Sequence, residues 1–143
     1  MEIKRRKINF TVAGEPRGKA RPRFCSNGQV YTPKQTTTYE QQIIFDYCKQ
    51  CGNVKFDENS QLELFVKAYY KIPKSASKKK KAEMRIGGIR PTKKPDGDNI
   101  LKAVADALNG VCYKDDKCLI KMSIEKFYGD VPRIDVVVQE VEQ

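Results

Sequence analysis

Two aspartates in a strongly basic chain are the residues whose chemistry can be inferred most directly. Asp96 and Asp98 stand two positions apart at the expected start of a helix, in a chain of 143 residues with a formal net charge of +10. Carboxylates this close repel each other unless a cation or a shared proton relieves them. Mg²⁺ is often bound by one or two carboxylates together with water and phosphate oxygens. The spacing therefore indicates a magnesium site acting on phosphate, with Gly97 letting both side chains turn inward.

Three further residues fit the same chemistry. Asp115 and Asp116 form a second acidic pair in a short loop, and neighbours on an extended segment point in opposite directions, so we expect one of them to reach the metal. Lys102, one helical turn beyond Asp98, could hold a phosphate oxygen or offset charge in the transition state. A metal ion at this place would lower the pKa of a bound water molecule.

The composition excludes several other chemistries. The chain has no histidine, which removes histidine triads, histidine general bases and histidine-rich zinc sites. Its five cysteines, an odd number, favour free thiols in a reducing cytosol. A zinc site formed by four of them is the alternative, although the last two are poorly spaced for it: Cys48, Cys51, Cys112 and Cys118.

Simpler readings of the acidic residues remain open when each motif is taken alone. The Asp96–Asn99 segment could be a capping turn, with Asp98 as the N-cap, and the later pair could be an ordinary exposed turn. A calcium loop of the EF-hand type fails because the twelfth position from Asp96 is Ala107. Segment 14–23 is not a phosphate-binding P-loop, since its glycines are too close and Ala20 follows the lysine. The conjunction of acidic sites, a lysine and basic flanks favours the metal site.

The positive charge is concentrated in two segments. Residues 1–35 hold nine basic and two acidic side chains, residues 71–94 hold ten and one, and the rest of the chain has a net charge of −6. Basic segments neutralise phosphates and bind nucleic acid regardless of base sequence. For the run 78–81 alone, a solvated loop that aids solubility is the alternative. We expect these side chains to contact DNA: Lys19, Arg21, Arg23, Lys78, Lys79, Lys80, Lys81, Lys93 and Lys94.

Hydrophobic periodicity predicts the elements that must position these residues. Alternation predicts strands over 8–12, 61–72, 118–127 and 133–141, and a hairpin over 24–31 that turns at Asn27-Gly28. A helix is expected over 33–51, with Thr32 as its cap and Pro33 as its first residue. Residues 73–94 are expected to be a long basic loop.

The helix expected over 98–109 has the clearest pattern. Its apolar residues fall on one face, and Asp98, Lys102 and Asp106 fall in a stripe about 80° wide on the other side. Asn109-Gly110 is a typical C-terminal stop. The apolar face consists of Ile100, Leu101, Val104, Ala105 and Leu108.

These elements predict a single domain over residues 1–143 of the α/β class, α+β type. It has a mixed sheet, two main helices and the order β-β-β-α-β-α-β-β. No apolar run approaches the roughly 20 residues of a membrane span, and no apolar signal core follows the basic N-terminus. We therefore expect a cytoplasmic protein with no membrane association.

At these motifs the chain resembles the RusA-type Holliday-junction resolvases, a family of crossover junction endodeoxyribonucleases. The resemblance is strongest over 94–110 and continues to 113–116, where the Asp-x-Asp-Asn-x-x-Lys stretch is quite specific. It also covers 14–23 and 31–40, and so nearly the whole chain. The 73–94 segment is long, and its lysine run has no counterpart that we can assign.

The resemblance implies a small homodimeric, Mg²⁺-dependent endonuclease that cuts four-way DNA junctions symmetrically in recombination and repair. Mn²⁺ could replace Mg²⁺, and the source would be a bacterium, phage or prophage. The resemblance assigns Asp96, Asp98 and Asp116 as metal ligands, with Asp115 a further candidate, and Lys102 as the catalytic lysine.

Two other functions compete with this one. Another metal-dependent nuclease, acting on flaps or on RNA, could use the same scaffold. A non-catalytic nucleic-acid-binding protein could have kept the basic segments alone. The complete set of three aspartates and a lysine argues against the second, because an acidic cluster without a metal would repel DNA.

Overall fold

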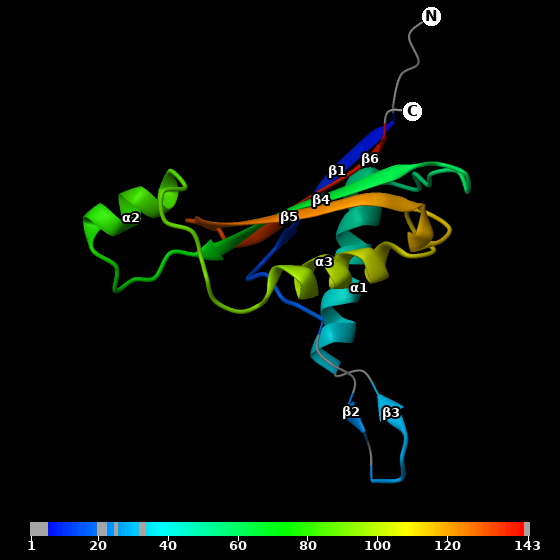
Figure 1. Cartoon of the computed structure of the whole chain (residues 1–143), viewed down its shortest axis with the longest axis horizontal. Coiled ribbons are helices and arrows are strands. Elements are labelled where there is room, and N and C mark those ends of the chain that lie inside the picture. The colour runs from blue at the N-terminus through cyan, green and yellow to red at the C-terminus, as the bar shows by residue number, and fades with distance from the viewer. Residues whose placement is uncertain (1–5, 20–22, 25, 32–33, 142–143) are drawn as a thin grey trace, which may run out of the picture.

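The structure, a computed structural model, is a four-stranded sheet with two long helices packed on one face (Figure 1). It describes residues 6–19, 23–24, 26–31 and 34–141. The predicted mixed sheet and α+β class are confirmed. The predicted order of helices and strands is also confirmed, apart from two short added elements, the helix Lys78–Arg85 and the 3₁₀ turn Asp116–Cys118. In chain order the elements are β1 Lys7–Ala13, β2 Arg23–Phe24, β3 Val30–Tyr31, α1 Lys34–Cys51, β4 Leu62–Lys71, α2 Lys78–Arg85, α3 Gly97–Leu108, the 3₁₀ turn η1 Asp116–Cys118, β5 Leu119–Gly129 and β6 Arg133–Glu140.

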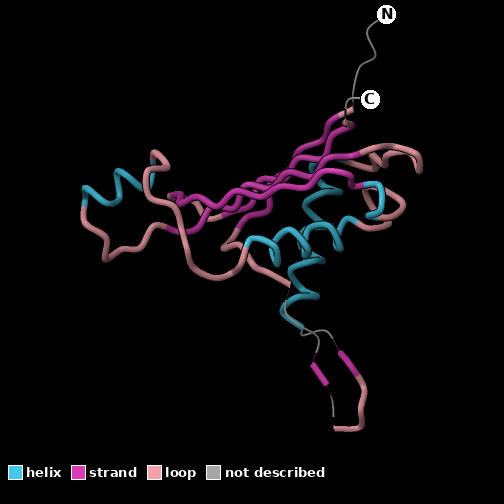
Figure 2. The backbone as a smooth tube through the Cα atoms, viewed as in Figure 1, coloured by secondary structure: helices cyan, strands magenta, loops and turns pink. Residues whose placement is uncertain are grey.

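The sheet has the order β1-β6-β4-β5. Strands β4 and β5 are parallel, while β6 runs antiparallel to both β1 and β4. The strands lie side by side in one twisted layer above the two long helices (Figure 2). Parallel neighbours need a long crossover connection, and residues 72–118 supply it. This crossover carries α2, α3 and η1, so the predicted metal ligands and Lys102 lie on the segment that links the two parallel strands.

Helices α1 and α3 cover one face of the sheet and enclose the core with it (Figure 1). The strict alternation of β4 buries every second residue from Leu62 to Tyr70 and leaves those between half-buried. Ile100, Val104 and Leu108 of α3 are completely buried against this face. Burial of each such side chain stabilises the fold by about 1.5–3 kcal/mol, which holds the apolar stripe of α3 to the sheet and leaves its polar stripe outside.

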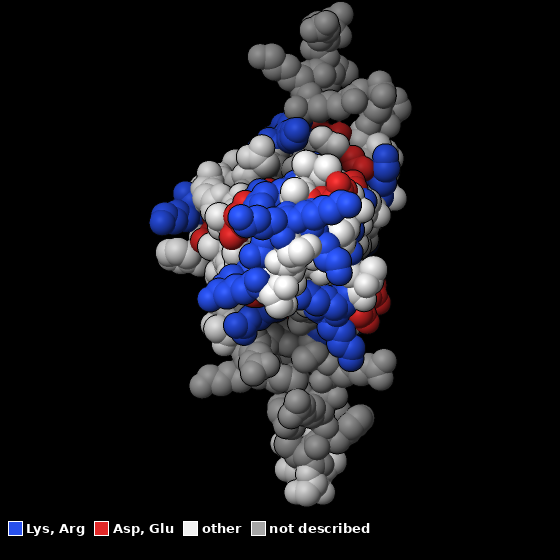
Figure 3. Space-filling view, turned by 90° about the vertical axis from the view of Figure 1, so that its left-hand side faces the viewer, with Lys and Arg blue, Asp and Glu red and all other residues white. Residues whose placement is uncertain are grey.

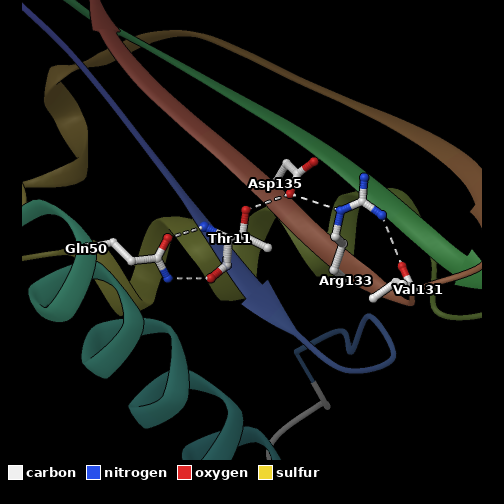
Figure 4. Close-up of polar contacts among 5 residues, drawn as sticks. All are labelled: Thr11, Gln50, Val131, Arg133 and Asp135. Carbon is white, nitrogen blue, oxygen red and sulfur yellow. Dashed lines mark hydrogen bonds and ion pairs between the residues drawn. The ribbon is translucent and has the colours of Figure 1, made fainter.

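The edge strand β1 is covered by a side chain of α1. Gln50 accepts a hydrogen bond from the backbone N–H of Thr11 at 2.8 Å and donates one to the Thr11 carbonyl at 2.7 Å (Figure 4). The Thr11 hydroxyl donates to Asp135 of β6, which also pairs with Arg133. Free backbone groups on an edge strand invite pairing with another chain, and the Gln50 amide satisfies two of them.

Helix α2 corrects the prediction of a long loop over 73–94. The Ser77 side chain caps this helix by accepting a hydrogen bond from the Lys80 N–H at 3.2 Å. Lysine has a straight side chain and a good helix propensity, so the run 78–81 can form a helix once it is capped. The sequence concealed it because α2 has no apolar stripe, Met84 being its buried residue.

The helix boundaries differ slightly from the prediction. Asp96 holds the N-cap position of α3, and Asp98, which was predicted as the cap, lies in the first turn. Thr32 and Pro33, predicted to start the first helix, fall outside the described residues, and α1 is described from Lys34. Within the described part of the chain, no helix is both long enough and apolar enough to cross a membrane.

The predicted hairpin is present as β2 and β3. They pair antiparallel, with Phe24 opposite Val30, and Gly28 has the positive φ of 84° that its turn requires. Figure 1 places the hairpin beyond the N-terminal end of α1, away from the sheet.

Candidate active site on helix α3

The first predicted aspartate pair lies at the exposed start of α3. Asp96 has an extended backbone (φ −68°, ψ 146°), and its side chain makes no capping hydrogen bond. Asp98 follows in the first turn, and both residues are exposed. An N-cap aspartate usually accepts a bond from a first-turn N–H. Within the described ranges neither carboxylate has an ion pair, so both are available to a ligand.

Contacts with the sheet hold the start of α3 in place. Tyr70, at the end of β4, donates its hydroxyl hydrogen to the carbonyl of Pro95 at 2.5 Å. A Cβ atom on Gly97 would lie 3.2 Å from Cγ2 of Ile124 in β5, so glycine lets the helix begin close to the sheet. Asp96 and Asp98 are both exposed on either side of Gly97, and their turning inward towards a shared ion stays a prediction.

Lys102 lies one turn after Asp98 on the solvent side of α3. The residue is exposed, and no ion pair to its ammonium group is found among the described side chains. Ile100, Ala103 and Val104, which surround it in sequence, are buried. The polar stripe of α3 is therefore present as predicted, with Lys102 between the exposed Asp98 and the half-buried Asp106.

Lys19, which is also a predicted DNA contact, links the loop over 14–19 to α1 and α3 through two carboxylates. Its ammonium group pairs with Asp106 of α3, and lies 3.5 Å from Glu40 of α1. Burial lowers the pKa of Lys19. The hydrogen bond to Asp106 and the charge of Glu40 together raise it by more, so the pKa of Lys19 is raised overall. The Lys19 N–H also donates to the Asn99 carbonyl at 3.0 Å. Lys19 therefore joins the segment 14–19 to helices α1 and α3.

Gly18 makes this link possible. A Cβ atom at this position would lie 2.8 Å from the Cβ of Asn99 and 3.3 Å from that of Pro95. Real Cβ atoms do not approach that closely, so any other residue would push the loop away from the start of α3. The loop over 14–19 is thus packed directly beside the aspartate pair.

The second acidic pair has two different members. Asp115 caps η1, and its side chain accepts a hydrogen bond from the Lys117 N–H at 3.1 Å. That bond lowers the pKa of Asp115. Asp116 is exposed, and the adjoining Asp115 carboxyl, partial burial and the charge of Asp106 raise its pKa. Asp115 therefore shapes the turn, while Asp116 is the more exposed of the two residues.

The structure does not bring Asp116 to the first pair within one chain. Asp116 feels the charge of Asp106, and Asp106 follows Asp98 by eight residues, which is about 12 Å along a helix axis at 1.5 Å per residue. In the part of the chain that is described, no three acidic or cysteine side chains lie close enough together to hold a metal ion. The two predicted halves of the metal site lie near opposite ends of α3.

The donor set at the start of α3 nevertheless fits a hard divalent cation. Mg²⁺ commonly uses one or two carboxylates and completes its shell with water and phosphate oxygens, and Asp96 and Asp98 are two such exposed groups. The thiols do not offer a competing zinc site, because the four described cysteines are free and do not form a metal-binding group.

The remaining predicted DNA contacts lie mostly on one side of the molecule. Figure 3 shows lysine and arginine side chains gathered over the α2 end. Lys78 to Lys80 are exposed on α2 and Lys81 is half-buried, while Lys93 and Lys94 are exposed just before α3. Arg21 is outside the described residues, and only the backbone of Arg23 is described, in β2.

Tyr70 is a site residue that the sequence analysis did not single out. It is 2% exposed, and burial together with the charge of Asp96 raises its pKa to about 12. Its hydroxyl therefore remains a donor to Pro95 at neutral pH. The signal was available, since a buried tyrosine needs a partner for its hydroxyl and Tyr70 ends a strand on the buried face.

Comparison with known proteins identifies the family. The family Endodeoxyribonuclease RusA matches residues 13–139. The chain is also 38% identical over 139 residues to the uncharacterized protein YqaN of Bacillus subtilis (strain 168), covering 94% of this chain and 96% of that protein. The resemblance seen in the sequence is thereby confirmed: the chain belongs to the RusA family of endodeoxyribonucleases.

Proposed function

We propose that this protein is a Mg²⁺-dependent endonuclease that resolves four-way DNA junctions by paired, symmetric cuts. The observation that carries the proposal is the exposed pair Asp96 and Asp98, without a capping bond or a described ion pair. Unpaired carboxylates two positions apart repel each other, and a bound cation would relieve the repulsion. Divalent-metal dependence is general among RusA resolvases, and Mn²⁺ is the alternative ion.

The residues of α3 divide the chemistry among them. Asp96 and Asp98 would hold the metal ion, which supplies an activated water and stabilises charge on phosphorus when it is bound. Lys102 would donate to a non-bridging phosphate oxygen and offset the charge that develops there. The first-turn N–H groups and the dipole of α3 add positive potential where the phosphate would sit.

A homodimer would complete the site. Because Asp116 lies near the far end of α3, it can join the first pair only if it comes from a second copy of the chain. A two-fold axis crossing the middle of α3 would place the start of one helix beside the end of the other. Two such sites related by the same axis match a four-way junction, which itself has approximate two-fold symmetry.

A substrate and metal panel tests this function. We expect a synthetic four-way junction to be cut at symmetric positions with Mg²⁺ or Mn²⁺ and to stay intact in EDTA. A linear duplex of the same sequence should be cut far more slowly. Preferential cutting of a flap or of RNA would favour another nuclease on this scaffold. Junction binding without cleavage in either metal would favour a non-catalytic binding protein.

A further inference from the structure

A groove beside the aspartate pair is lined by lysines that the proposed site does not use. It has a volume of about 530 Å³ and lies between the end of β4 and the segment that leads into α3. Its walls include four exposed lysines, which we call the lysine groove: Lys71, Lys74, Lys93 and Lys94. Glu15 is the one acidic side chain in its lining, so the local charge is strongly positive.

These lysines differ from many other cations of the described surface, which are neutralised by acidic partners. Arg85 pairs with Asp130, and Lys114 pairs with Glu58. No ion pair to the four ammonium groups of the groove is found among the described residues. Four cations around one hollow, none with an acidic partner in the described part of the chain, would attract a polyanion.

The groove continues directly into the aspartate pair. Lys94 is separated from Asp96 only by Pro95, and Pro95 lines the groove. Tyr70 is a second lining residue, and it is the one that fixes the Pro95 carbonyl. A DNA strand has one phosphate per 3.4 Å of helix axis, so a strand crossing Asp96 would bring its neighbouring phosphates over the groove.

The walls of the groove are held in position by strand β5. Lys126 donates to the Lys93 carbonyl at 2.6 Å, and Arg90 donates to the Lys126 carbonyl at 2.7 Å. The Arg90 guanidinium also lies 4.2 Å from the centre of the Phe127 ring. These contacts fix the segment that carries Lys93 and Lys94, so the groove is formed before any ligand arrives.

We infer that the lysine groove is a phosphate track that holds the DNA strand next to the cut, with Lys71 and Lys74 as contacts. The inference rests on the proposed nuclease function and adds to it the path of the strand. The track runs from the start of α3 towards α2, where the lysine-rich helix lies. It recognises backbone phosphates and carries no base specificity.

The salt dependence of junction binding in EDTA tests the track without requiring cleavage. We compare the double variant Lys71→Gln/Lys74→Gln with Lys49→Gln/Lys55→Gln, a control that removes the same charge from exposed positions outside the groove. The logarithm of the binding constant falls with the logarithm of the salt concentration, and each lost phosphate contact makes this slope shallower by about 0.9. Because the proposed homodimer has two such grooves, the groove variant removes four contacts. We expect it to lose about 3.6 from the magnitude of the slope and the control to keep the wild-type value. Arginine at both positions should restore the slope.

The outcomes separate the track from the function. Equal slopes for the two double variants, in a protein that still binds and cuts the junction, would overturn the track and leave the nuclease proposal standing. A reduced slope in the groove variant of a protein that cuts no junction would support the track and overturn the nuclease proposal.

Discussion

The two ends of helix α3 carry the same kind of side chain in opposite circumstances. At its start, Asp96 and Asp98 are exposed and have neither a capping bond nor an ion pair to a described residue. Towards its end, Asp106 is half-buried and bound to Lys19, and Asp115 holds the turn that follows. Asp106 and Asp115 use their charges within the fold, whereas Asp96 and Asp98 have no described partner.

The difference distinguishes structural acids from acids kept for a ligand. Removing Asp106 would leave Lys19 with the more distant Glu40 alone, so that carboxylate contributes to stability. Removing the Asp98 carboxylate breaks no described ion pair. The Asp98 carboxylate makes no described ion pair within the fold, which leaves it available for the metal ion of the proposed site.

The largest expected effect is on junction cleavage, when two inactive variants are mixed so that the start of one α3 helix meets the end of another across a dimer. Subunits with Asp98→Asn and subunits with Asp116→Asn should each be inactive alone. A mixed dimer would contain one doubly altered site and one site with both aspartates intact, so mixing should restore nicking of one strand of the junction. The mixture is unfolded and refolded so that subunits exchange, and the restored nicking is then measured as single-turnover cleavage with Mg²⁺. A mixture as inactive as its components would contradict a shared site.

A smaller effect is expected when the paired end is disrupted. Lys19→Met leaves Asp106 and Glu40 without the cation that lies between them. The lost ion pair is largely shielded from solvent, since the side chains of Lys19 and Asp106 are 24% and 27% exposed. We expect the free energy of unfolding to fall by about 1–2 kcal/mol, measured by urea denaturation. Lys114→Met, which removes a largely exposed ion pair with Glu58, should cost less than about 0.5 kcal/mol. Equal losses in the two variants would count against the Lys19 link.

The stability difference between wild type and Lys19→Met should also depend on pH. The pKa of Lys19 is raised in the folded state, so its stabilising effect is complete below the ordinary value of 10.5 and is lost as the pH rises through the folded-state pKa. The stability difference between wild type and Lys19→Met should therefore be constant near neutral pH and shrink above 10.5. A difference that begins to shrink at lower pH would show that Lys19 is not the titrating group.

The sequence predicted the parts of this comparison that depend on local pattern. The alternation of β4 and the apolar stripe of α3 identified both elements, because burial of one face imposes the period of the element. It did not reveal α2, whose capped lysine run has no apolar stripe. The Lys19–Asp106 pair, 87 residues apart in the chain, and the distance between Asp98 and Asp116 depend on how the crossover packs against the sheet. No local pattern encodes such long-range packing.

The most direct measurement compares Asp98→Asn with Asp106→Asn for both junction cleavage and stability. The account predicts that Asp98→Asn abolishes Mg²⁺-dependent cleavage, retains junction binding in EDTA and unfolds at the wild-type denaturant concentration. Asp106→Asn should lose about 1 kcal/mol of stability yet still cut the junction at temperatures where it is folded. Cleavage at the wild-type rate by Asp98→Asn would contradict the assignment of the free end of α3 as the active site.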